Sequence, residues 1–171
     1  AELLTSERRH QWHPFTQMRD WCAPGHDPLV LVGGRGSLLY DAQGKEYIDG
    51  NSSIWTNIHV HNHPRINAAI TEQLSLVAHT SFLGFTHPGA IQLAEELIAL
   101  FPVATMSRVF FSDDGSTAIE VAIKMAVKHW QLRGEPNRTR FVAFAEGYHG
   151  DTMGASSLGG VSVFHERFSP W

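Results

Sequence analysis

An apolar run that leads directly into a glycine–serine turn is the feature that most constrains the fold of this chain. Phe110 and Phe111 are followed by Ser112-Asp113-Asp114-Gly115-Ser116, and apolar residues then recur at helical spacing from about Ser116 to Leu132. This pattern predicts a strand, a tight turn and a long helix. The start of such a helix directs backbone N–H groups and the positive end of the helix dipole to one point, which suits a phosphate group.

A second apolar run, Arg140 to Ala145, is followed by Gly147-Tyr148-His149-Gly150-Asp151. Together with the run Arg108 to Ser112 and the long helix, it predicts parallel strands joined by a right-handed crossover. Ligands of parallel sheets bind beyond the carboxyl ends of the strands. We therefore expect Ser116 to bind a phosphate and Tyr148 to stack on a planar ring of the same ligand. The alternative is that both groups only stabilise turns.

The rest of the chain divides into simpler patterns. Residues 10 to 28 predict an extended arm, and residues 29 to 49 predict a small antiparallel meander in which Gly34-x-Gly36 is a hairpin turn and not a dinucleotide loop. Helices are predicted after Pro64 and from about Pro88. Their expected buried residues are Ile66, Ile70, Leu74 and Val77 in the first helix and Leu93, Ala94, Leu97, Leu100 and Phe101 in the second.

The long helix has one narrow polar stripe, which includes Lys124 and Lys128, and is otherwise apolar. We expect it to be buried on most sides, as in a layered α/β domain. Thr117-x-x-Glu120 predicts a capping box at its start. Glu120 is also spaced for an ion pair with Lys124.

Composition excludes several classes of protein. The 171 residues are 43% hydrophobic and 18% charged, which is typical of a globular chain with one core. The net charge of -4 and the scattered basic residues argue against nucleic-acid binding. No apolar run has the length of a membrane span, the N-terminus does not resemble a signal peptide, and Cys22 has no partner for a disulfide. These features predict a cytoplasmic protein that binds neither membranes nor nucleic acid.

Seven sequence blocks together resemble a known family. They are Trp12-His13-Pro14-Phe15-Thr16-Gln17-Met18, Asp49-Gly50-Asn51-Ser52-Ser53-Ile54-Trp55, His61-Asn62-His63-Pro64, Thr86-His87, Ser112-Asp113-Asp114-Gly115-Ser116, Glu120-Val121-Ala122-Ile123-Lys124-Met125-Ala126 and Gly147-Tyr148-His149-Gly150-Asp151-Thr152. These blocks resemble class III aminotransferases, which depend on pyridoxal 5'-phosphate (PLP). This resemblance implies an α/β, fold-type I PLP-dependent transferase, with an N-terminal arm and small β meander over residues 1–58 and the first part of a large, mainly parallel-sheet domain over residues 59–171. The blocks most resemble the biotin-biosynthesis branch, which implies amino transfer to 8-amino-7-oxononanoate.

The same resemblance implies roles for individual residues. The cofactor would be held by Gly115, Ser116, Tyr148 and Asp151. The substrate would contact Trp55, Phe15, Ile54 and Tyr148. The loop from Phe82 to His87 is similar to a segment that reaches the neighbouring subunit's site, so a homodimer is implied.

Three positions depart from the family pattern. Phe15 stands where many relatives that use S-adenosylmethionine carry Tyr, and Ile54 stands where they carry a second Trp. The amino donor is therefore open between S-adenosylmethionine and lysine. Asp114 replaces a more usual Ser, and a carboxylate near a phosphate is unfavourable unless it faces away as a helix cap.

Transamination requires a lysine that forms a Schiff base with PLP. The chain contains only Lys45, Lys124 and Lys128, which lie in a predicted hairpin and on the polar helix stripe. The resemblance implies that the Schiff-base lysine lies beyond Trp171. We therefore predict that this chain is the N-terminal part of the enzyme, contains no catalytic residue and is inactive alone.

Three alternatives remain open at this point. Another class III aminotransferase would act on ω-amino acids, ornithine or 4-aminobutyrate. A metal-binding module would use the three imidazoles of His59-x-His61-x-His63, although no Cys, Asp or Glu completes the set nearby. A non-catalytic interaction protein would retain the first part of the fold with exposed sheet edges and apolar faces.

Overall fold

A computed structural model describes residues 2–161 of the chain. The chain forms two compact units, Ala1–Phe85 and Thr86–Trp171. The predicted domain boundary between residues 58 and 59 stays a prediction. Trp171, the limit beyond which the Schiff-base lysine was expected, lies outside the described residues.

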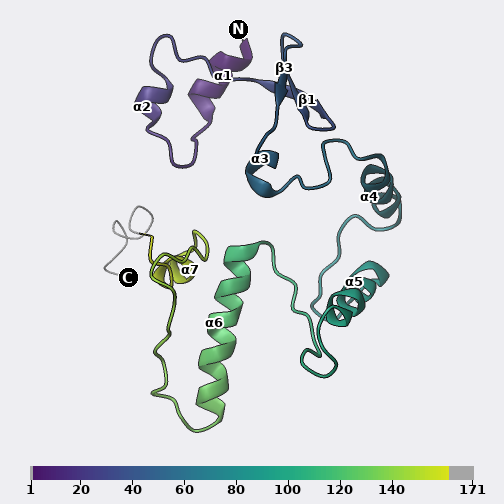
Figure 1. Ribbon diagram of the computed structural model, residues 1–171, viewed down its shortest axis with the longest axis vertical. Coiled ribbons are helices and arrows are strands. Elements are labelled where there is room, and N and C mark those ends of the chain that lie inside the picture. Colours follow the sequence, from purple (N-terminus) through teal and green to yellow (C-terminus); the bar gives the residue numbers. More distant parts are fainter. Residues whose placement is uncertain (1, 162–171) are drawn as a thin grey trace. The chain divides into compact units, whose positions relative to one another are not determined.

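The first unit begins with two helices, α1 (Glu2–His10) and α2 (Met18–Trp21) (Figure 1). The predicted extended arm is therefore partly helical. Glu7 links α1 to α2, because its Oε1 atom accepts hydrogen bonds from the His13 ring and from the Trp21 indole, the latter at 2.9 Å. The hydrogen bond from His13, followed by that from Trp21, holds the pKa of Glu7 below its ordinary value.

The predicted meander is confirmed. Strands β1 (Leu31–Arg35), β2 (Leu38–Asp41) and β3 (Glu46–Ile48) form an antiparallel sheet in the order β1-β2-β3. Asp41 stabilises its second turn, since its buried carboxylate accepts hydrogen bonds from the Lys45 and Gln43 N–H groups and from the Tyr47 hydroxyl, each at 2.9 Å.

Two further elements complete the first unit. The short segment α3 (Ser52–Trp55) is followed by the helix α4 (Pro64–Leu76), which begins at Pro64 as the sequence predicts. The predicted burial of α4 is wrong, because Ile70 and Leu74 are 54% and 58% exposed. Within the described residues of the first unit, no strand or other helix packs extensively against this face.

The second unit contains α5 (Pro88–Ala99), α6 (Gly115–Leu132) and α7 (Met153–Ser157) (Figure 1). The first two confirm the predicted helices. The predicted strands at 108–112 and 140–145 are not formed as strands. A strand requires a neighbour for its ladder of hydrogen bonds. Within the described range these two segments pair neither with each other nor with any other segment.

The expected burial of α5 and α6 is also wrong. Ala90 is the buried residue of α5, whereas Leu93 and Leu100 are 47% and 79% exposed. None of the α6 side chains is fully buried. Among the described helices of the second unit, extensive packing joins only α6 and α7. No helix in residues 2–161 combines the length and apolar character needed to cross a membrane.

His61 connects the meander to the segment that follows it. Its backbone pairs with Gly36 through two hydrogen bonds, at 2.9 and 3.2 Å. Its ring lies directly over Gly34, where an added Cβ atom would be 2.9 Å from the imidazole Cγ. The absence of a side chain at Gly34 therefore determines where the His61 ring can lie.

We expect Gly34→Ala to destabilise the protein by about 1–3 kcal/mol, because the new methyl group overlaps the His61 ring. Gly33→Ala is the matched control, since its Cβ would meet only Tyr40 Cδ2 at 3.9 Å. Thermal unfolding of the two variants tests this difference. Equal stability of both variants would contradict the close packing of His61 on Gly34.

Candidate functional site

The start of α6 is fixed by Asp114 and Thr117. Asp114 Oδ1 accepts the Thr117 N–H at 2.7 Å, and the Thr117 hydroxyl oxygen accepts the Asp114 N–H at 3.0 Å. This reciprocal pair is a capping box, so the predicted box between Thr117 and Glu120 is wrong. Asp114 has the role of a helix cap, and its carboxylate is occupied by the backbone of its own helix.

Ser116 and the 147–151 loop meet at the start of α6. The Ser116 Oγ atom accepts the N–H of Asp151 at 3.1 Å, which leaves the hydroxyl proton able to donate to a ligand. The Tyr148 hydroxyl donates to Asp151 Oδ2 at 2.8 Å. This hydrogen bond to Asp151 raises the pKa of Tyr148, so its hydroxyl stays protonated near neutral pH.

Gly150 permits this close approach. It is buried, has a φ of +131°, and an added Cβ would overlap the Ser116 side chain. Only glycine adopts such a backbone conformation without strain. The structure thus brings together all four predicted cofactor-binding residues, Gly115, Ser116, Tyr148 and Asp151, although the two predicted strands that preceded them are not formed.

These residues border an open hollow of about 520 Å³. Its lining residues are Asp114, Gly115, Ser116, Ile119, Tyr148, His149 and Gly150. A Cβ added at Gly115 would meet nothing within 4 Å, so the helix backbone is open to a ligand there. Within the described chain no acceptor takes the N–H groups of Gly115 and Ser116. The donors and the open space fit a phosphate group.

Glu120 anchors α7 to α6. Its Oε1 atom accepts the N–H groups of Gly154 and Ala155 at 2.8 and 3.2 Å, at the start of α7. The Thr152 hydroxyl, followed by these N–H groups, lowers the pKa of Glu120. The predicted ion pair with Lys124 is absent from the ion pairs of the described residues, and Lys124 has only a minor electrostatic effect. The hydrogen bonds that Glu120 accepts from the start of α7 were not predicted from the sequence.

The predicted substrate residues Phe15, Ile54 and Trp55 lie in the first unit. All three are exposed, Phe15 by 78%, Ile54 by 66% and Trp55 by 80%. Each has a positive φ, of 51°, 59° and 63° respectively. Their contacts with a substrate remain predictions.

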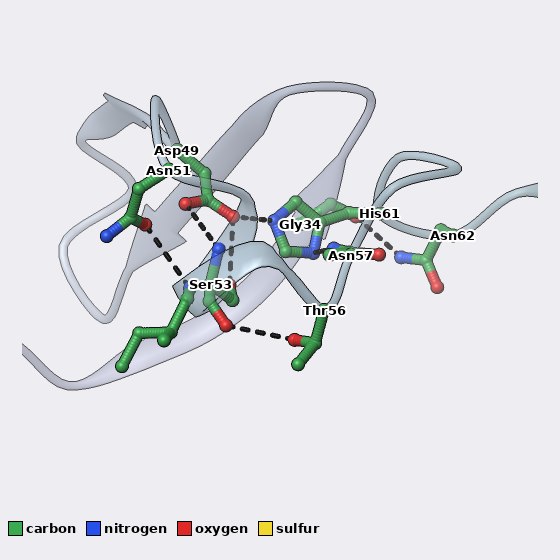
Figure 2. Close-up of polar contacts among 9 residues, drawn as sticks. Gly34, Asp49, Asn51, Ser53, Thr56, Asn57, His61 and Asn62 are labelled. Atoms are coloured by element: carbon green, nitrogen blue, oxygen red, sulfur yellow. Dashed lines mark hydrogen bonds and ion pairs between the residues drawn. The ribbon is translucent and has the colours of Figure 1, made fainter. Parts of the chain in front are cut away.

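A network of polar contacts surrounds the α3 segment (Figure 2). Asp49 accepts hydrogen bonds from the Ser53 N–H at 2.9 Å and the Ser53 hydroxyl at 2.8 Å, and it contacts His61 Nε2 at 2.9 Å. The Ser53 contacts, then His61, lower the pKa of Asp49. Both ring nitrogens of His61 therefore have partners, Nε2 the Asp49 carboxylate and Nδ1 the Asn57 side chain. Within residues 2–161 no group of three or more potential metal ligands is found.

Comparisons with known proteins identify the family of the chain. Residues 21–171 match the family described as aminotransferase class-III. The chain belongs to the class-III aminotransferase family. It is 46% identical over 164 residues to the adenosylmethionine-8-amino-7-oxononanoate aminotransferase of Geobacter sulfurreducens, covering 96% of this chain and 36% of that relative.

Solved class-III aminotransferases have the same fold. The crystal structure of the adenosylmethionine-8-amino-7-oxononanoate aminotransferase from Methanocaldococcus jannaschii gives a TM-score of 0.92 at 40% identity, covering 99% of this chain and 38% of that one. An omega transaminase from Pseudomonas jessenii, solved in complex with PMP, gives 0.90 at 32% identity, with coverage of 99% and 37%. The chain therefore spans over a third of the length of these class-III relatives.

We predict that Gly150→Ala destabilises the second unit by about 1–3 kcal/mol, because the methyl group overlaps Ser116 and the residue must leave its φ of +131°. Gly115→Ala serves as the control at the same hollow, since its methyl group meets open space. Chemical denaturation compares the two. If Gly150→Ala is as stable as Gly115→Ala, the close contact with Ser116 is wrong.

The docking of α7 should depend on pH. The pKa of Glu120 in the folded protein lies below its ordinary value of 4.5, so its contacts stabilise α7 above that pH and are lost as the pH falls through the lower, folded value. We expect the exchange protection of the Gly154 and Ala155 amides to fall in that acidic range.

The control is Glu95→Gln, which neutralises an exposed carboxylate on α5 and should keep the acidic loss of protection. Glu120→Gln should remove it. An acidic transition that persists unchanged in Glu120→Gln would show that another group controls the docking of α7.

Proposed function

We propose that the protein is a PLP-dependent aminotransferase that converts 8-amino-7-oxononanoate to 7,8-diaminononanoate in biotin biosynthesis. The observation that carries this proposal is the 46% identity, over 96% of the chain, to a relative named for that reaction. Because the chain matches only 36% of that relative, the activity is assigned to the complete gene product.

The hollow at the start of α6 supplies the cofactor site in this proposal. The N–H groups of Gly115 and Ser116, together with the Ser116 hydroxyl, would bind the phosphate of PLP. The positive end of the dipole of the 18-residue helix α6 favours the negatively charged phosphate. When bound, PLP supplies an electron sink that stabilises negative charge at the reacting carbon of the substrate.

Tyr148 and Asp151 orient the ring of the cofactor. The hydrogen bond from the Tyr148 hydroxyl to Asp151, at 2.8 Å, restricts the rotation of the phenol ring beside the hollow. Its aromatic face would then stack on the cofactor and exclude water from that side. The Asp151 N–H holds Ser116 in place, so the ring site and the phosphate site share one set of contacts.

Substrate recognition is assigned to apolar side chains of the first unit. Phe15, Ile54 and Trp55 provide an exposed apolar surface suited to the long alkyl chain of 8-amino-7-oxononanoate. Phe15 and Ile54 replace the Tyr and Trp of many S-adenosylmethionine-using relatives. The amino donor in this proposal is therefore S-adenosylmethionine or lysine.

The lysine that would bind PLP covalently lies outside the present sequence in this proposal. Lys124 and Lys128 are exposed on α6, and Lys45 lies beside the Tyr47 ring in the meander. A homodimer and a cytoplasmic location complete the proposal, on the basis of the Phe82 to His87 loop and of the single Cys22.

A second candidate is an omega transaminase. It is favoured by the TM-score of 0.90 to the Pseudomonas jessenii enzyme, although the identity of 32% is lower. Assays of the complete gene product with 8-amino-7-oxononanoate and with 4-aminobutyrate separate the two functions. We expect amino transfer to 8-amino-7-oxononanoate, and turnover of 4-aminobutyrate alone would contradict the proposal.

The 171-residue chain should be inactive without the remainder of the gene product. After treatment with PLP and borohydride, none of its three lysines should carry a stoichiometric PLP adduct. Mass spectrometry locates any adduct. A stoichiometric adduct on Lys45, Lys124 or Lys128 would contradict the assignment of the covalent lysine to a later segment.

Gly115→Ala tests the phosphate site in the complete gene product. The methyl group fills the open space beside the helix start without disturbing the fold, and it should displace the phosphate from one N–H group. A hydrogen bond to a charged group is worth about 1.5–3 kcal/mol, so PLP should bind roughly 10- to 100-fold more weakly. Gly89→Ala, in the first turn of α5, is the control and should bind PLP normally.

A further inference from the structure

The segment Ser52–Trp55 is strained. Its four residues have φ values of 53°, 51°, 59° and 63°, and none of them is glycine. A left-handed helical conformation is unfavourable for an L-residue, and it is rarest for a β-branched residue such as Ile54. Such a conformation persists only where neighbouring groups fix it.

Asp49 is the group that fixes this left-handed turn. One carboxylate oxygen accepts the Ser53 N–H and the other accepts the Ser53 hydroxyl, at 2.9 and 2.8 Å. The Asp49 side chain is only 7% exposed. The Asn51 carbonyl adds a hydrogen bond from the Trp55 N–H at 2.8 Å, which closes the turn.

His61 in turn holds Asp49. Its Nε2 atom contacts the carboxylate at 2.9 Å, and its Nδ1 atom is hydrogen-bonded to the Asn57 side chain (Figure 2). The position of His61 is set by the sheet, through the backbone pairing with Gly36 and the packing over Gly34. A continuous path of contacts therefore runs from β1 through His61 and Asp49 to the turn.

The turn displays two apolar side chains, Ile54 and Trp55, which are 66% and 80% exposed. We propose that Asp49 and His61 are positioning residues that hold the left-handed turn, and thereby set the affinity of the enzyme for the apolar substrate contacted by Ile54 and Trp55. This inference rests on the proposed function, which assigns these two side chains to substrate binding. Neither Asp49 nor His61 touches the substrate in this account.

Two substitutions in the complete, PLP-loaded gene product test the proposal. Asp49→Asn removes acceptors for Ser53 and His61, and His61→Phe keeps a ring over Gly34 while it removes both hydrogen bonds. Each should raise the KM for 8-amino-7-oxononanoate by at least about tenfold, since a displacement of about 1 Å in a substrate contact has effects of this order. The affinity for PLP should change by less than about twofold, because neither substitution removes a hydrogen bond to the cofactor. The loss of even one such bond would weaken PLP binding by more than that.

Relief of strain distinguishes positioning from a general loss of stability. Ser52→Gly places a residue that tolerates positive φ in the turn, so it should reduce the KM effect of Asp49→Asn when the two are combined. Asp41→Asn is the matched control. It disrupts a buried carboxylate of the same meander that has no contact with the turn, and it should leave the KM unchanged.

Hydrogen exchange of the 50–58 segment gives a readout that does not require activity. Asp49→Asn and His61→Phe should accelerate exchange at Ser53 and Asn57, and Asp41→Asn should not. The proposal is overturned if Asp49→Asn and Asp41→Asn have equal effects on KM and exchange, or if Ser52→Gly gives no rescue. If the wild-type enzyme acts only on 4-aminobutyrate, the proposed function fails, and the same comparison is made with that substrate.

Discussion

The second unit depends on one carboxylate, that of Glu120. It accepts hydrogen bonds from the Gly154 and Ala155 N–H groups, which have no acceptor within their own helix. These bonds fix the start of α7 to α6. The loop that carries Tyr148 and Asp151 ends at this anchor. Asp151 can therefore reach Ser116 at the start of α6, and the groups that would hold a phosphate and an aromatic ring meet at one hollow. Close packing at Gly150 then leaves the loop no space to move toward the helix.

The first unit is organised in the same way. Asp49 binds the backbone and hydroxyl of Ser53, and His61 connects this carboxylate to the sheet. In both units one carboxylate holds a loop by accepting several hydrogen bonds, whereas large apolar side chains such as Leu74, Leu100 and Phe144 stay exposed. Polar anchors thus set the local geometry of the loops, and the apolar faces of the helices are available for packing against other protein surfaces.

Local signals in the sequence predicted the helices α4, α5 and α6 correctly, but not α1, α2, α3 or α7. Pro64, Pro88 and the Gly115-Ser116 turn mark helix starts, and each of these helices begins within a residue of the predicted position. The meander was also predicted correctly, because its turns lie close to its strands in sequence. The prediction of strands at 108–112 and 140–145 was wrong, since a strand is defined by a partner that its own residues do not specify.

The anchors were also beyond prediction from spacing. Glu120 lies 34 residues from Gly154, and His61 lies 12 residues from Asp49. Glu120 was instead interpreted through its neighbours Thr117 and Lys124, and His61 through the alternating histidines around it. Gly115 and Ser116 were predicted as cofactor residues because glycine and serine at a helix start can donate backbone N–H groups to a phosphate. The class-III resemblance added Tyr148 and Asp151 to that prediction.

The proposed function depends on the start of α6 as the site of the PLP phosphate. A crystal structure of the complete gene product with PLP would show where the phosphate binds. We expect its oxygens to lie within hydrogen-bond distance, about 3 Å, of the Gly115 and Ser116 N–H groups and of the Ser116 hydroxyl, with Tyr148 stacked on the ring. A cofactor whose phosphate binds away from this helix start would contradict the assignment.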